Sequence, residues 1–219
     1  RSILHVMPKA GEKQGPSAAI TIIRLNDGKM EYYSLGDCTL SVKYRDGSVD
    51  TYTNKELVRL DNKVFHYMQQ LAATDSEVGS VRRAATLPAI EAEKLANRNL
   101  KNESGGYWIL DLSGAGIPHG TYRTFNPHII ESLALMTDGT SDLYNLPKPP
   151  DPADGTGRDL GLGLGSLSKE QVHEWLMEDP TAAVKYLKDE YEADADWEKY
   201  PRFSALDDIT VLTMALVAG

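Results

Sequence analysis

The chain has 219 residues, of which 41% are hydrophobic and 25% charged, as in one medium globular domain or at most two small ones. Its formal net charge of -9 argues against a nucleic-acid-binding protein, because such proteins usually carry a basic face. No apolar run approaches the roughly 20 residues that a membrane span needs. The single cysteine, Cys38, allows no internal disulfide, so we expect a cytoplasmic protein. From the charge and the lack of a long apolar run, we expect it to bind neither nucleic acid nor membrane.

The first quarter of the chain has the pattern of an antiparallel meander. Short β-rich or alternating segments are separated by two strong turn dipeptides, Asp27-Gly28 and Asp46-Gly47. We expect strands over residues 17–25, 30–35, 39–44 and 48–52.

The middle of the chain changes to helical periodicity. Asn54 can cap a helix whose apolar residues recur every three or four positions up to Leu71. A second helix is predicted over 81–98, with a charged open face. A loop over 102–106 then leads into a short strand over 107–110.

The second half of the chain alternates strand and helix patterns. The apolar run 129–136 predicts a buried strand, and 209–217 predicts a last strand. Ser168-Lys169-Glu170-Gln171 is a capping box, and Asp179-Pro180 opens a helix to about residue 193. The stretch 145–165 is rich in Pro, Gly and Asp, which is typical of a long surface loop. The whole pattern predicts an α+β fold with sheets in the middle and helices outside.

Acidic residues stand where several of these strands begin or end. Asp138 follows the apolar run 129–136 and precedes Gly139, and Asp142 comes four residues later, so one turn of chain could bring both carboxylates to one side. Asp37 follows the second strand, and Asp207-Asp208 precedes the last one. Rigid strand ends that carry oxygen ligands suit hard cations such as Mg²⁺ or Mn²⁺.

Each acid also has an ordinary structural explanation. Gly36-Asp37 can be a simple turn, Asp142 can be an exposed acid or a helix cap, and Asp207-Asp208 can be a solvated pair. The metal-site hypothesis therefore depends on the four positions acting together. His119 or His128 could serve as a proton donor in such a site, although surface or packing roles are commoner for isolated histidines.

The order of these motifs resembles that in the PP2C-type (PPM) metal-dependent Ser/Thr protein phosphatases. Their Gly-Asp, Asp-Gly and Asp-Asn/Asp motifs come in the same order along the chain. The matching segments here are Gly36-Asp37-Cys38, Thr137-Asp138-Gly139 and Asp207-Asp208-Ile209-Thr210. The bacterial PP2C-like branch is closer still, through Asn102-Glu103-Ser104-Gly105-Gly106-Tyr107-Trp108 and Tyr200-Pro201-Arg202. The resemblance covers the chain from about Pro16 to its end.

The resemblance implies a single domain over 1–219 with a PP2C-like α-β-β-α sandwich of two antiparallel sheets flanked by helices. It implies a cluster of two or more Mn²⁺ or Mg²⁺ ions and a metal-activated water that attacks phosphorus. By position, Asp138 and Asp207 match the central metal ligands, and Gly139 matches the small residue beside them. Asp37 and Asp142 match acids that, with Asp138, hold a further and weaker metal.

Three departures from the family pattern matter. The family's first metal motif, a strand-borne Asp-Gly, and an Arg that grips phosphate precede the region where this chain starts, so we expect the chain to be N-terminally incomplete. Cys38 stands where the family usually has Ser. Asp208 stands where the wider family has Asn.

The sequence therefore predicts hydrolysis of phosphomonoesters, in particular of phosphoserine or phosphothreonine on proteins, with a phosphorylated protein or small phosphoester as substrate. The alternative is a catalytically inactive PP2C-like module that binds a regulatory partner or a phosphorylated ligand.

Overall fold

A computed structural model describes residues 15–146, 167–203, 205–206 and 208–216 of the chain. It contains helices together with antiparallel sheets, which confirms the predicted α+β class. Its residues fall into two compact units, each assembled from separate stretches of sequence. The first unit draws on 1–38, 53–127 and 194–205, and the second on 39–52, 128–193 and 206–219.

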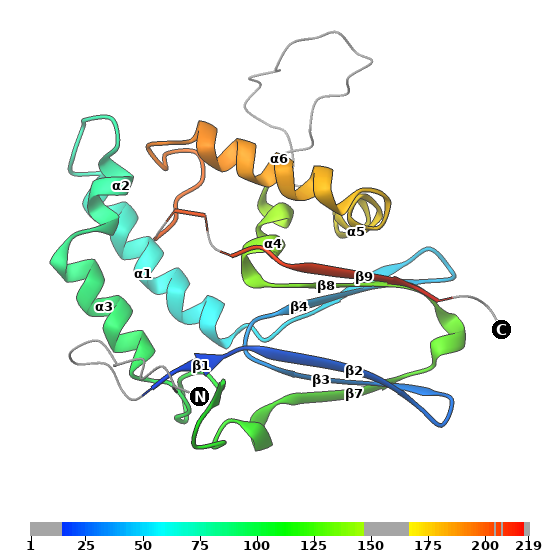
Figure 1. Cartoon of the computed structure of the whole chain (residues 1–219). Helices are drawn as coiled ribbons and strands as arrows, with labels where there is room; N and C mark the ends of the chain where they lie inside the picture. The colour runs from blue at the N-terminus through cyan, green and yellow to red at the C-terminus, as the bar shows by residue number, and fades with distance from the viewer. Residues whose placement is uncertain (1–14, 147–166, 204, 207, 217–219) are drawn as a thin grey trace, which may run out of the picture. The chain divides into compact units, whose positions relative to one another are not determined.

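The first unit contains a three-stranded antiparallel sheet in the order β2-β3-β7 (Figure 1). The hairpin between β2 and β3 closes through Asp27 and Gly28, both with positive φ, as the turn dipeptide predicted. Buried and less buried residues alternate along the first part of β3, from Lys29 to Tyr33, as the two faces of a pleated strand require. The strands are β2 (Ile20–Asn26), β3 (Lys29–Leu35) and β7 (Thr121–Phe125), with a separate short pair of β1 (Ser17–Ala18) and β6 (Leu110–Asp111).

In this unit one helix was predicted as continuous, one strand was not predicted, and the strand predicted over 107–110 is the shorter β6 (Leu110–Asp111). The helix predicted over 81–98 is two helices, because Pro88 has no N–H to donate and its ring disfavours helical backbone before it. Strand β7 was not predicted, because four of its five side chains are exposed and its pattern carries little apolar signal. The helices are α1 (Glu56–Ala72), α2 (Ser80–Ala85) and α3 (Pro88–Arg98), with the 3-10 turn η1 (Ile117–His119).

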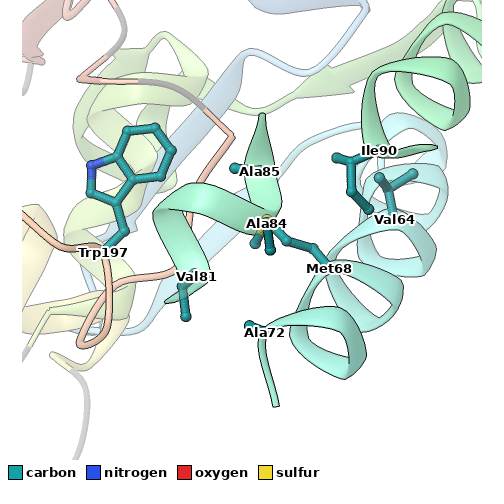
Figure 2. Packing of buried hydrophobic residues seen from close by; sticks show 8 residues of the cluster. All are labelled: Val64, Met68, Ala72, Val81, Ala84, Ala85, Ile90 and Trp197. Carbon is teal, nitrogen blue, oxygen red and sulfur yellow. The ribbon is translucent and has the colours of Figure 1, made fainter. Parts of the chain in front are cut away.

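The helices α1, α2 and α3 pack on one another around a core of their own. Val64, Met68 and Ala72 lie on one stripe of α1 and meet Ile90 of α3, together with Val81, Ala84 and Ala85 of α2 and the loop residue Trp197 (Figure 2). The spacing of four residues along α1 is the periodicity that predicted this helix.

The second unit contains a four-stranded antiparallel sheet in the order β5-β4-β8-β9, with α5 against it (Figure 1). Strand β8 lies in the middle and is mostly buried, as its apolar run predicted. The strands are β4 (Thr39–Tyr44), β5 (Val49–Tyr52), β8 (Ile130–Met136) and β9 (Val211–Ala215), and the helices are α4 (Asp138–Ser141), α5 (Lys169–Glu178) and α6 (Pro180–Ala193). Two 3-10 turns, η2 (Pro127–Ile129) and η3 (Asp142–Asn145), complete the elements.

Both helix starts predicted in this unit are confirmed. Ser168 and Gln171 form the reciprocal capping box at the start of α5. The carboxylate of Asp179 accepts a hydrogen bond from the Ala182 N–H at 2.9 Å, and Pro180 is the first residue of α6. The loop predicted over 145–165 lies almost wholly outside the described residues. No helix within the described ranges is both long and apolar enough to cross a membrane.

Candidate metal site at the end of the central strand

Asp138 lies where the central strand β8 gives way to helical backbone. The strand ends at Met136, Thr137 is extended, and α4 begins at Asp138 itself. One carboxylate oxygen of Asp138, Oδ1, accepts a hydrogen bond from the Gly139 N–H at 2.8 Å. Gly139 and Thr140 are buried behind it. The carboxylate is thus fixed to the end of a rigid strand.

Asp142 follows Asp138 by one turn of continuous helical backbone. The 3-10 turn η3 begins at Asp142, directly after α4 ends, and Asp142 itself has right-handed helical angles. Residues four apart in a helix share a face, so the two carboxylates lie on the same side of this segment. The phenol of Tyr191, on α6, donates a hydrogen bond to Oδ2 of Asp142 at 2.8 Å.

Thr137 connects this strand end to the segment that precedes β9. Its hydroxyl lies 3.1 Å from the carbonyl oxygen of Asp208 and accepts from the Thr210 N–H at 3.0 Å. The Thr137 N–H in turn donates to the Thr210 carbonyl at 3.1 Å. The chain on the carboxyl side of Asp207 therefore runs beside the residue that precedes Asp138. Asp207 itself lies outside the described residues.

Asp37 belongs to the first unit, in the short link after β3. Gly36 before it has φ +93°, and a Cβ there would lie 2.6 Å from the Cβ of Ala19, so only glycine fits. The Thr53 hydroxyl donates to the carbonyl oxygen of Asp37 at 3.0 Å, and the side chain of Asp37 is half-buried. Gly36 and Asp37 thus form a bend in the link between β3 and β4.

Carboxylate oxygens are the ligands that a hard divalent cation prefers, and Asp138 and Asp142 place two carboxylates on one face of this segment. Within the described part of the chain, no group of three or more His, Cys, Asp and Glu residues could hold a metal ion. Asp207 lies outside that part of the chain. The two carboxylates of Asp138 and Asp142 are of the chemical kind that a hard cation prefers.

The other motif residues have structural roles in the first unit. The side-chain oxygen of Asn102 accepts from the Ile109 N–H at 2.9 Å, and the Trp108 ring stacks on His119 with centroids 3.4 Å apart. Arg202 forms an ion pair with Asp194 at 2.9 Å, with both side chains largely buried. His119 is thus a stacking partner in this structure.

A buried histidine on α5, His173, was not singled out from the sequence. His173 has no exposed surface, and its Nδ1 and Nε2 each lie 2.8 Å from a serine hydroxyl, Ser41 on β4 and Ser132 on β8. Burial lowers the pKa of His173, and the nearby Lys43 ammonium lowers it further, whereas Glu131 and Glu174 oppose the shift. The signal in the sequence was a serine on each of two apolar strands, which suits a polar partner inside the core.

A hollow of about 640 Å³ lies at the other end of the four-stranded sheet. It is lined by Tyr44, Arg45, Asp46, Ser48, His128 and Ile129. Thr39 pairs with Met136 near Asp138, whereas Tyr44 pairs with Ile130 at the far end of the same two strands. The hollow is therefore separate from the candidate metal site.

Comparison with known proteins identifies no family for this chain. No family model matches the chain, and no curated protein matches it.

Proposed function

We propose that the chain carries part of the metal centre of a PP2C-type phosphatase that hydrolyses phosphomonoesters, with phosphoserine or phosphothreonine on proteins as the substrate class. The observation that carries the proposal is the position of Asp138 at the end of the buried strand β8, with Asp142 one helical turn later. The order of the Asp37, Asp138 and Asp207 motifs supports the same function.

Asp138 and Asp207 would hold the central Mn²⁺ or Mg²⁺ ions, and Asp142 would join Asp138 around a weaker one. Such cations, when bound, acidify a water molecule and neutralise phosphoryl oxygens. Gly139 keeps the chain beside Asp138 small, and the hydrogen bond from its N–H to Oδ1 orients the carboxylate. We likewise propose that the fold is a PP2C-like α-β-β-α sandwich.

The first test is Asp138→Asn in the protein expressed from its natural reading frame. We expect Mn²⁺-dependent hydrolysis of p-nitrophenyl phosphate to fall by about two orders of magnitude, because a metal contributes several kcal/mol and each tenfold in rate is about 1.4 kcal/mol. Asp189→Asn is the matched control, since Asp189 is exposed on α6 and pairs with Lys185. Unchanged activity of the Asp138 variant would contradict the proposal.

The competing function is a PP2C-like module that binds a phosphorylated ligand without hydrolysing it. A wild-type protein that binds a phosphopeptide but releases no phosphate with Mn²⁺ present would establish it.

A further inference from the structure

A hydrogen bond joins the carboxylate of Asp142 to helix α6. Tyr191 lies in the last turn of α6, only 9% exposed, and its hydroxyl donates to Oδ2 of Asp142 at 2.8 Å. An O–H donor facing a carboxylate makes a charge-assisted bond, which is stronger than one between neutral groups. The bond therefore constrains the direction of the Asp142 side chain.

Apolar contacts can hold α6 and η3 together without this bond. Ala183, Leu187 and Tyr191 recur every four residues along one stripe of α6, and the first two have no exposed surface. Leu143, within η3, and Leu146, directly after it, are also completely buried. The turn η3 contacts α6. Tyr191 is the member of this stripe that bears a polar atom, and that atom meets Asp142.

The chemistry of the donor suits a carboxylate that also binds a cation. A phenol at neutral pH carries no charge, so it orients Asp142 without neutralising it. A Lys or Arg at the same place would compete with a cation electrostatically. A carboxylate accepts at two oxygens and about four lone-pair sites, which allows a hydrogen bond and a cation at the same time.

We propose that Tyr191 is a positioning residue that holds Asp142 in the orientation required to bind a divalent cation. The inference rests on the proposed function, in which Asp142 contributes to the weaker cation site. Groups that orient a metal ligand commonly change metal affinity by 10–100-fold when removed. Because this ligand is one of several and is partly exposed, we expect an effect at the lower end, about tenfold.

The test is Tyr191→Phe, which removes the hydroxyl and retains the ring. Mn²⁺ binding is followed by the electron paramagnetic resonance signal of the free ion, which separates tight and weak classes of sites without any need for turnover. We expect the weak class to lose about tenfold in affinity while the tight class is unchanged. With p-nitrophenyl phosphate, the Mn²⁺ concentration for half-maximal activity should rise, and activity at saturating Mn²⁺ should be retained.

Tyr186→Phe is the matched control, because Tyr186 lies on the same helix and its ring packs on Trp175, 5.3 Å between centroids. We expect this variant to bind Mn²⁺ as the wild type does. Wild-type Mn²⁺ binding by Tyr191→Phe, together with loss of binding by Asp138→Asn, would overturn the inference and leave the proposed function intact. Weakening of both classes together with a lower metal-free melting temperature would make Tyr191 a structural residue and overturn it too. Mn²⁺ binding that is absent, or unaffected by Asp138→Asn, would overturn both.

Discussion

At the scale of single residues, His173 shows how a buried polar group can be held without a charged partner. A neutral imidazole donates through one ring nitrogen and accepts at the other, and a serine hydroxyl can take either part. Ser41 and Ser132 therefore satisfy both nitrogens inside the sheet. Protonation would place a charge in this buried position, which is costly.

The stability of the protein should depend on pH through His173. Because its pKa is lowered in the folded state, the unfolded chain binds more protons than the folded one between the folded pKa and the ordinary value of about 6.5. The stabilisation is complete above about pH 6.5 and is lost as the pH falls toward the folded pKa. Urea denaturation at a series of pH values measures this loss.

The variant His173→Gln should remove that part of the pH dependence, because glutamine does not titrate. At pH 7.5 we expect it to cost about 1–2 kcal/mol, from imperfect replacement of two buried hydrogen bonds. His66→Gln, at an exposed position on α1, is the control. An unaltered pH profile in the His173 variant would show that another group causes the dependence.

Two features of Gly36 disfavour any larger residue there: its positive φ and the close approach of Ala19. Experiment can separate their effects. Its φ is +93°, and an added Cβ would lie 2.6 Å from the Cβ of Ala19. Gly47 has a similar φ of +87° but nothing within 4 Å of an added Cβ. Gly47→Ala thus tests the backbone conformation alone.

We expect Gly47→Ala to cost about 1–2 kcal/mol of unfolding free energy, and Gly36→Ala to cost about 1–3 kcal/mol more through overpacking. Chemical denaturation of both variants gives the difference. Equal costs would show that the link before Asp37 relaxes to accommodate a methyl group.

At the scale of elements, the three-helix cluster of the first unit depends on one stripe of α1. Met68 lies between Val64 and Ala72 on that stripe (Figure 2) and has no exposed surface. Val58 on the same helix is 48% exposed. The same substitution type at these two positions therefore distinguishes core from surface.

Met68→Ala should lower the free energy of unfolding by about 2–5 kcal/mol, because it removes buried surface and leaves a cavity. Val58→Ala should change it by less than about 0.5 kcal/mol. Guanidinium denaturation of both variants provides the measurement. A small effect at Met68 would mean that the three helices close around the missing side chain.

The elements that the sequence predicted well carried strong local signals. Strand β4 was predicted at its observed bounds, 39–44, because its pattern fits a pleated strand and Asp46-Gly47 closes its hairpin. Strand β7 was missed because pairing with β3, about ninety residues away in the chain, holds an exposed segment in the sheet. Pro88 by itself indicates the break between α2 and α3, because proline disfavours helical backbone at the residue before it.

At the scale of the whole molecule, the chain passes several times between its two compact units. The four strands of the second unit's sheet come from three separate stretches of sequence. The pairing of strands from distant stretches has no local sequence signature, because it depends on contacts between residues far apart in the chain. The residues matched by family order are divided in the same way, with Asp37 in the first unit and Asp138 and Asp142 in the second.

The sequence by itself determined the mixed helix and strand content, the hairpin turns, two helix caps and the placement of Asp138 and Asp142 one turn apart. These follow from backbone preferences over a few residues. Only the tertiary structure decided that Thr137 meets Asp208, 71 residues later, that Tyr191 meets Asp142 across 49 residues, and that two serines enclose His173. Side-chain hydrogen bonds across such separations form only after the elements have packed, so no local pattern predicts them.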